Sequence, residues 1–107
     1  ETGDAWAGAY DEAEAIFRDV LRRAPHYGDA VAALADLDIW QGHYEVALEL
    51  IGREEPFNRG DPELMLRKAR ALFYSGRRDD AVTILDDLHS HYPEYPEATE
   101  FRTRSGI

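Results

Sequence analysis

Several residue types in this chain recur at intervals of 34 residues, and this period limits the folds open to it more than any other feature. The positions that keep the interval are Gly8, Gly42 and Gly76, then Ala13, Ala47 and Ala81, then Trp6, Trp40 and Tyr74. Pro25 and Pro93 lie two periods apart. Because four residue types share one register, the sequence predicts an internal structural repeat.

Apolar residues follow each of these glycines at the spacing of an amphipathic helix. The three stripes are Ala13, Ile16, Phe17 and Val20, then Ala47, Leu50 and Ile51, then Ala81, Ile84, Leu85 and Leu88. Intervals of three, four and seven residues place each stripe on one helical face. Similar stripes precede the second and third glycines. No segment alternates with period two, so we predict an all-α fold without strands.

The residues between the stripes predict where helices begin and end. Glycine tolerates a left-handed backbone, so we expect Gly8, Gly42 and Gly76 to form the turns between antiparallel helices. Pro25 and Pro93 are expected to end the second helix of their units. We also expect Asp61 to cap a helix that has Pro62 at its first position, and Asp29 or Gly28 to cap the preceding first helix.

The second unit departs from this pattern at its end. Arg59 stands where the other units have proline, and the segment GREEPFNRGDP carries Gly52 and Pro56. We expect these two residues to end the helix early, which makes it the shortest of the second helices.

The unit of helix, glycine turn, helix and proline resembles the tetratricopeptide repeat family. The second helix of that family carries Ala, three residues and an aromatic residue, followed by Pro, which Ala13, Phe17 and Pro25 match. The segments 47–51 and 81–85 match with an aliphatic residue in the aromatic position. The first helices depart from the family, with Val31 and Met65 in place of Trp. Lys68 replaces a Leu, and Asp38 replaces a Tyr.

The resemblance covers nearly the whole chain and implies a right-handed α-solenoid of antiparallel helix pairs. We expect one array over residues 1–107, composed of a partial unit 1–27, units 28–61 and 62–95, and the start of a further helix in 96–107. Residues 1–7 are expected to form at most a short helical turn. A solenoid needs capping units at its ends. Its unfinished ends therefore indicate an excerpt of a longer array or possible self-association.

The resemblance also implies a non-catalytic scaffold that binds a protein or peptide, as an extended segment or a helix, in a concave groove lined by the first helices. When the family's groove positions are carried over to the matching faces of the first helices here, the groove residues are Asp36, Ile39, Trp40, Leu66, Arg67, Arg70, Phe73 and Tyr74. The alternative for Trp6, Trp40 and Tyr74 is packing between successive units. The alternative for Arg67 and Arg70 is a solvated pair that balances Glu63 and Asp36.

Some members of the family hold the C-terminal carboxylate of a partner with Lys, Asn and Arg on these helices. Ala32, Ala33 and Asp36 occupy the matching face here, so we do not expect that carboxylate clamp.

Composition excludes several other classes of function. With 12 Lys and Arg against 22 Asp and Glu, the net charge of −10 argues against a nucleic-acid partner. The chain has no cysteine, and His26, His43, His89 and His91 do not have the spacing of metal ligands, so no metal or cofactor is expected. No apolar run approaches the roughly 20 residues of a membrane span. Acidic pairs at helix starts suit the helix dipole and give no reason to expect an enzyme.

Two further interpretations remain open. The segments WQGHYEVAL and YSGRRDDAV are similar to repeats of bacterial envelope proteins that export polysaccharide or precede an outer-membrane β-barrel, and exposed Trp and Tyr side chains can stack on sugar rings. Alternatively, the array only spaces or oligomerises its neighbours. The lack of cysteine suits both the cytoplasm and the bacterial periplasm, so the compartment stays undecided.

Overall fold

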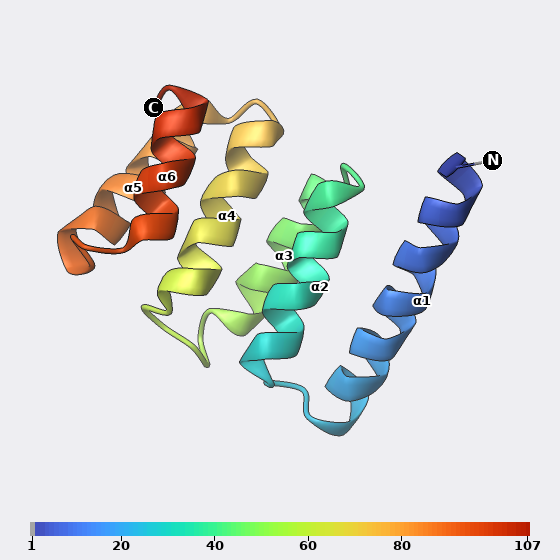
Figure 1. Cartoon of the computed structure of the whole chain (residues 1–107). Coiled ribbons are helices and arrows are strands. Elements are labelled where there is room, and N and C mark those ends of the chain that lie inside the picture. The colour runs from blue at the N-terminus through green and yellow to red at the C-terminus, as the bar shows by residue number, and fades with distance from the viewer. Residues whose placement is uncertain (1) are drawn as a thin grey trace.

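The computed structural model describes residues 2–107, with side chains from Gly8 onward. Its six helices are α1 (Thr2–Arg23), α2 (Gly28–Trp40), α3 (Tyr44–Glu54), α4 (Pro62–Tyr74), α5 (Arg78–His91) and α6 (Pro96–Ser105), and residues 2–107 contain no strand. Figure 1 shows α2, α4 and α6 side by side in one layer, with α3 and α5 behind them. Each helix packs on the next, and α2 packs on α4. The predicted all-α helical repeat is therefore confirmed.

Two of the three predicted glycine turns are present. Gly42 and Gly76 have φ values of 81° and 91°, in the left-handed region that favours glycine. The amide of His43 donates to the Asp38 carbonyl at 2.7 Å, and the amide of Arg77 donates to the Leu72 carbonyl at 2.8 Å. These bonds close the last turns of α2 and α4 and direct the chain back along the next helix.

The prediction of a turn at Gly8, with only a short turn of helix before it, is wrong. Helix α1 is 22 residues long and runs through Gly8 without a break. Three alanines, Ala5, Ala7 and Ala9, surround this glycine, and alanine is the strongest helix former. They offset the helix cost of about 1 kcal/mol that glycine carries. Gly42 and Gly76 have no such neighbours, since polar residues flank both.

Substituting alanine at these equivalent glycines is expected to have opposite effects. Gly76→Ala forces a Cβ into a left-handed conformation and should lower the free energy of unfolding by about 1–2 kcal/mol. In Gly8→Ala the new Cβ meets no heavy atom within 4 Å, and the change should raise the free energy of unfolding by about 0.5–1 kcal/mol. Urea unfolding followed by circular dichroism measures both. A stabilising Gly76→Ala, or a destabilising Gly8→Ala, would contradict this account.

Other helix boundaries follow the sequence signals closely. The side chain of Asp61 accepts the Glu63 amide at 3.0 Å, which caps α4 as predicted, with Pro62 in its first turn. Helices α1 and α5 end two residues before Pro25 and Pro93, as expected. Helix α3 has 11 residues against 22 and 14 for α1 and α5, so it is the shortest of the second helices.

Two predicted boundary residues have different roles in the structure. Helix α3 continues through Gly52 and ends before Pro56, so proline rather than glycine marks its end. Neither Gly28 nor Asp29 caps α2, because the helix already begins at Gly28 after Tyr27. The carbonyl of Tyr27 accepts the amide of Val31, and the backbone alone therefore starts this helix.

The core lies where the helices approach most closely. Ala47 and Ala81 are completely buried, which fits the small residue that the repeat places there. The largest cluster joins α4, α5 and α6 through Leu66, Ala69, Leu85, Leu88, Ala98 and Phe101. The first helices begin at Gly28, Pro62 and Pro96, and α6 provides the further first helix that was expected. The fold thus presents successive first helices on one side.

Candidate functional site

The predicted groove residues lie on α2 and α4, which run in the same direction side by side (Figure 1). Trp40 and Tyr74 are the last residues of these helices, and their exposed fractions are 66% and 50%. Asp36, Arg67, Arg70 and Phe73 are half-buried. We call this surface, made of Asp36, Trp40, Arg67, Arg70, Phe73 and Tyr74, the α2–α4 face. The side chain of Trp6 lies outside the described residues.

Two predicted groove residues do not belong to this surface. Ile39 is buried with Ala47 and Ala71, and Leu66 is buried in the cluster that contains Phe101. Helical phase placed Ile39 on one face with Trp40 and Leu66 on one face with Tyr74, but neighbouring helices cover them. In the described structure they stabilise the packing and are not available to a partner.

An ion pair links the two helices of the α2–α4 face. Arg67 Nη2 lies 3.0 Å from Asp36 Oδ2, and each side chain is only 18% exposed. Arg67 Nη1 also donates to the Glu63 carbonyl at 3.0 Å. Arg67 therefore balances Asp36, as the alternative expected, and it does not offer a free cation. The pair is mostly buried rather than solvated, and Arg70 takes no part in it. A half-buried pair of this kind fixes the relative positions of α2 and α4.

Arg70 belongs to an aromatic cluster instead. Its guanidinium carbon lies 5.6 Å from the ring centroid of Phe101, within the range of a cation–π interaction. Phe101 packs edge to face on Phe73 and Tyr74, with centroid distances of 5.7 and 6.1 Å. Tyr74 also lies 6.2 Å from Tyr44, at the start of α3. Three aromatic residues from three helices, Tyr44, Phe73 and Phe101, thus support the exposed ring of Tyr74.

Sequence reasoning missed Tyr44 and Phe101 in this cluster. Tyr44 keeps the 34-residue interval with Tyr10, and this signal was available. Phe101 had none, since its equivalents one and two periods earlier are Arg67 and Ala33. The alternative of packing between successive units concerned Trp6, Trp40 and Tyr74, and it fits the ring contacts of Tyr74 with Tyr44 and Phe101. It does not account for Trp40, whose side chain is mostly in solvent.

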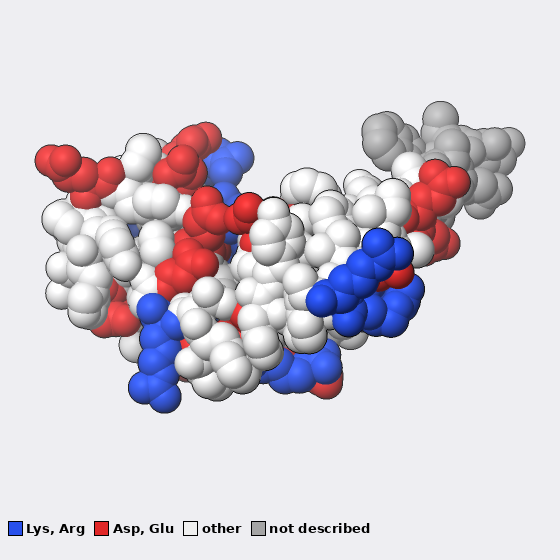
Figure 2. Space-filling view, turned by 90° about the horizontal axis from the view of Figure 1, so that it is seen from below, with Lys and Arg blue, Asp and Glu red and all other residues white. Residues whose placement is uncertain are grey.

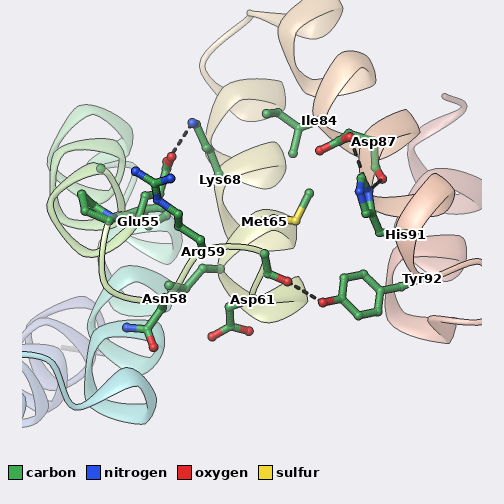
Figure 3. A pocket seen from close by; sticks show the side chains of 15 residues that line it. Glu55, Asn58, Arg59, Asp61, Met65, Lys68, Ile84, Asp87, His91 and Tyr92 are labelled. Carbon is green, nitrogen blue, oxygen red and sulfur yellow. Dashed lines mark hydrogen bonds and ion pairs between the residues drawn. The ribbon is translucent and has the colours of Figure 1, made fainter.

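A separate pocket of about 570 Å³ lies between α3, α4 and α5 (Figure 3). Its apolar lining includes Ile51, Leu64 and Ile84. It is also lined by Met65 and Lys68, at two positions where the family prefers Trp and Leu. We call it the α3–α5 pocket.

Several polar side chains around the α3–α5 pocket have partners within the chain. Lys68 Nζ lies 2.7 Å from Glu55 Oε1, and His91 lies 3.5 Å from Asp87. The hydroxyl of Tyr92 donates to the Gly60 carbonyl at 2.6 Å, and Figure 3 shows all three contacts.

The described part of the chain offers no site for a metal ion, since no three His, Asp or Glu side chains come together in it. None of the described helices has the length and apolar character needed to cross a membrane.

Comparison with known proteins identifies the repeat. Two models described as Tetratricopeptide repeat match the chain, one over residues 7–53 and the other over residues 63–95. No curated protein and no solved structure matches the sequence. Tetratricopeptide repeats generally mediate protein–protein interactions and are typically non-catalytic scaffolds. The two matches and the all-helical repeat architecture together show that this chain belongs to the tetratricopeptide repeat family.

Proposed function

We propose that this chain is a non-catalytic scaffold that binds a peptide or helix of a partner protein along the α2–α4 face. One observation carries the proposal: Trp40 and Tyr74, one repeat apart, expose large aromatic rings at the same end of two adjacent first helices. Exposed aromatic residues in a rigid setting are the usual energetic centres of protein interfaces.

The surroundings of these rings support the same role. The Asp36–Arg67 pair joins α2 to α4, and the rings of Phe73 and Phe101 pack against Tyr74. A partner would therefore meet a preorganised surface, which reduces the entropic cost of binding. The mixture of two exposed rings with the half-buried Arg70 suits a segment that carries apolar side chains and at least one acceptor group.

Alanine variants of the two exposed rings test this proposal. A partner captured with the natural full-length protein is first identified, and its affinity is then measured by calorimetry. Trp40→Ala and Tyr74→Ala should each weaken binding by tenfold or more, about 1.4 kcal/mol, because each removes a central aromatic contact. Ile16→Ala on α1 is the control, since Ile16 is equally exposed but lies outside the α2–α4 face. Unchanged affinity in both groove variants would refute the proposal.

The envelope-protein role and the spacer role stay predictions, and no contact in the structure favours either over peptide binding. The sugar-binding version of the envelope role predicts that oligosaccharides change the fluorescence of Trp40, and a flat titration counts against it. The cytoplasm and the bacterial periplasm both remain proposals for the compartment.

A further inference from the structure

A second hollow, of about 440 Å³, lies between α1, α2 and α3. Leu21, Val31, Leu34 and Leu50 form its apolar floor, and Arg18, Arg22 and Arg53 stand on its rim. We call it the α1–α3 niche. It is separate from the α2–α4 face, because Leu34 and Asp36 are two residues apart on α2 and so point to nearly opposite sides of that helix.

The niche and the α3–α5 pocket are the same place in successive repeats. Val31 and Leu50 of the niche lie 34 residues before Met65 and Ile84, which line the α3–α5 pocket. Both hollows lie where a second helix, the following first helix and the next second helix meet. Two of the four floor positions, those of Val31 and Leu50, are apolar in both copies.

The basic rim, in contrast, occurs in one copy alone. One period after Arg18, Arg22 and Arg53, the chain has Gly52, Pro56 and Asp87. The floor differs as well, since Leu34 corresponds to Lys68. The repeat architecture therefore does not require the three arginines. They give the α1–α3 niche a charge that its equivalent lacks.

A carboxylate in the niche already has hydrogen-bond partners of its own. Glu54 is the one carboxylate that lines it, and its side chain is almost fully buried. His26 Nδ1 lies 3.1 Å from Glu54 Oε2, and the side-chain amide of Asn58 donates to the other oxygen. Glu54 therefore faces inward and connects two loops.

The arginines of the rim pair only with carboxylates of their own helices. Arg18 lies 3.6 Å from Glu14, Arg53 lies 3.9 Å from Glu49, and Arg22 lies 2.9 Å from Asp19, which also pairs with Arg23. Each pair joins neighbours on one helix, and exposed pairs of this type contribute little energy. Figure 2 shows basic side chains gathered on the side of the molecule formed by α1. This basic area is unusual in a chain whose net charge is −10.

A stacked pair of aromatic rings lies at the edge of the niche. The ring of His26 stacks on Phe57 with a centroid distance of 3.6 Å, and Phe57 is largely exposed. The buried Glu54 holds His26 in that position. The niche thus combines an apolar floor with three cationic groups, and the exposed ring of Phe57 lies beside its His26.

We propose that the α1–α3 niche binds an acidic peptide segment of a partner protein, with an apolar side chain on the floor and flanking carboxylates at the arginines. Its volume lies within the range of sites that hold small ligands. Guanidinium groups suit carboxylates, which they can bind with two parallel hydrogen bonds. This second binding surface does not depend on the α2–α4 face.

The probe for this proposal is the peptide acetyl-Asp-Glu-Leu-Asp-Glu-amide, titrated into the ¹⁵N-labelled chain at about 20 mM salt, where surface charges are weakly screened. Amide signals near Leu21, Val31 and Leu50 should shift, and those near Trp40 and Tyr74 should not. Arg53→Asp, which copies the residue at position 87, should weaken binding by about tenfold, the loss expected when an attractive contact becomes repulsive.

Arg104→Asp is the matched control. Arg104 lies 4.0 Å from Glu100 on its own helix and is about as exposed as Arg53, so both variants change the same charge in the same kind of pair. It should leave the peptide affinity within about twofold, since only long-range charge changes.

Further ligands separate the two parts of the proposed chemistry. Acetyl-Asp-Glu-Gly-Asp-Glu-amide, which lacks the apolar side chain, and inorganic phosphate should both bind more weakly than the leucine peptide. Equal binding of either would overturn the proposal, as would tighter binding of decanoate than of the peptide. Equal loss of affinity in Arg53→Asp and Arg104→Asp would overturn it too.

Discussion

Replacing Phe101 with alanine is expected to lower the free energy of unfolding by about 3–5 kcal/mol, the usual cost of removing a buried phenylalanine ring. Phe101 is 1% exposed and lies in the cluster formed by α4, α5 and α6. Its ring contacts Phe73 and Tyr74 and also lies beneath the guanidinium of Arg70. Deleting it leaves a cavity and removes the main attachment of α6 to the rest of the fold.

Urea unfolding measures this loss directly, with Phe57→Ala as the control. Phe57 is also a phenylalanine, but its ring is mostly in solvent and stacks only on His26. Its removal should cost less than about 1 kcal/mol, as expected for an exposed aromatic pair. If Phe101→Ala cost no more than Phe57→Ala, α6 would not be held as the structure describes.

Asp38→Asn is expected to stabilise the chain at pH 7.5. Asp38 is 1% exposed, and neither of its carboxylate oxygens has a hydrogen-bond partner in the described structure. The pKa of Asp38 is raised from 3.8 to about 6, chiefly by burial and then by the carboxyl of Glu14, against the smaller lowering effects of Arg18 and His43. Two ionised carboxylates cannot bond to each other, so the pair gains a hydrogen bond only when one takes up a proton.

The pKa of Asp38 fixes the sign of the pH effect. Between about pH 4 and pH 6 the folded chain binds a proton that the unfolded chain has released, so this group makes stability fall as the pH rises. Above pH 6 the penalty is complete and amounts to at most about 3 kcal/mol. Asp38→Asn removes it and should raise the free energy of unfolding at pH 7.5 by about 1–3 kcal/mol, with a much smaller gain at pH 4.5.

Denaturant unfolding at the two pH values checks this prediction, with Asp36→Asn as the matched control. Asp36 is two residues away on the same helix but forms the ion pair with Arg67. Its neutralisation should not stabilise the chain at pH 7.5, because it leaves a half-buried arginine without its partner. An Asp38→Asn gain that is equal at both pH values would show that Asp38 is ionised in the same way in the folded and unfolded chains.

The periodicity of the sequence was sufficient to predict the helical repeat, because buried stripes, turn glycines and terminal prolines are all local signals. Gly42 and Gly76 behave as their register predicts. Gly8 shows the limit of that reasoning, since neighbouring alanines decide between a turn and a continuous helix. Proline likewise determined the end of α3 more strongly than Gly52 did.

The candidate site was predicted less completely, because helical phase gives the direction of a side chain but not what covers it. Trp40 and Tyr74 are exposed, whereas Ile39 and Leu66 on the same predicted surface are buried by neighbouring helices. Phe101, which supports Tyr74, lies on α6, whereas the predicted groove residues lie only on α2 and α4. The α1–α3 niche depends on three helices that meet, and a comparison of single stripes does not reveal such a place.

The central claim is that a partner binds on the α2–α4 face, and the fluorescence of Trp40 tests it most directly. The chain has two tryptophans, so a Trp6→Phe variant leaves Trp40 as the single reporter. Titrating this variant with the captured partner should shift the Trp40 emission to shorter wavelength, because binding removes the ring from water. A partner that binds with unchanged affinity while the emission of Trp40 stays constant would contradict the claim.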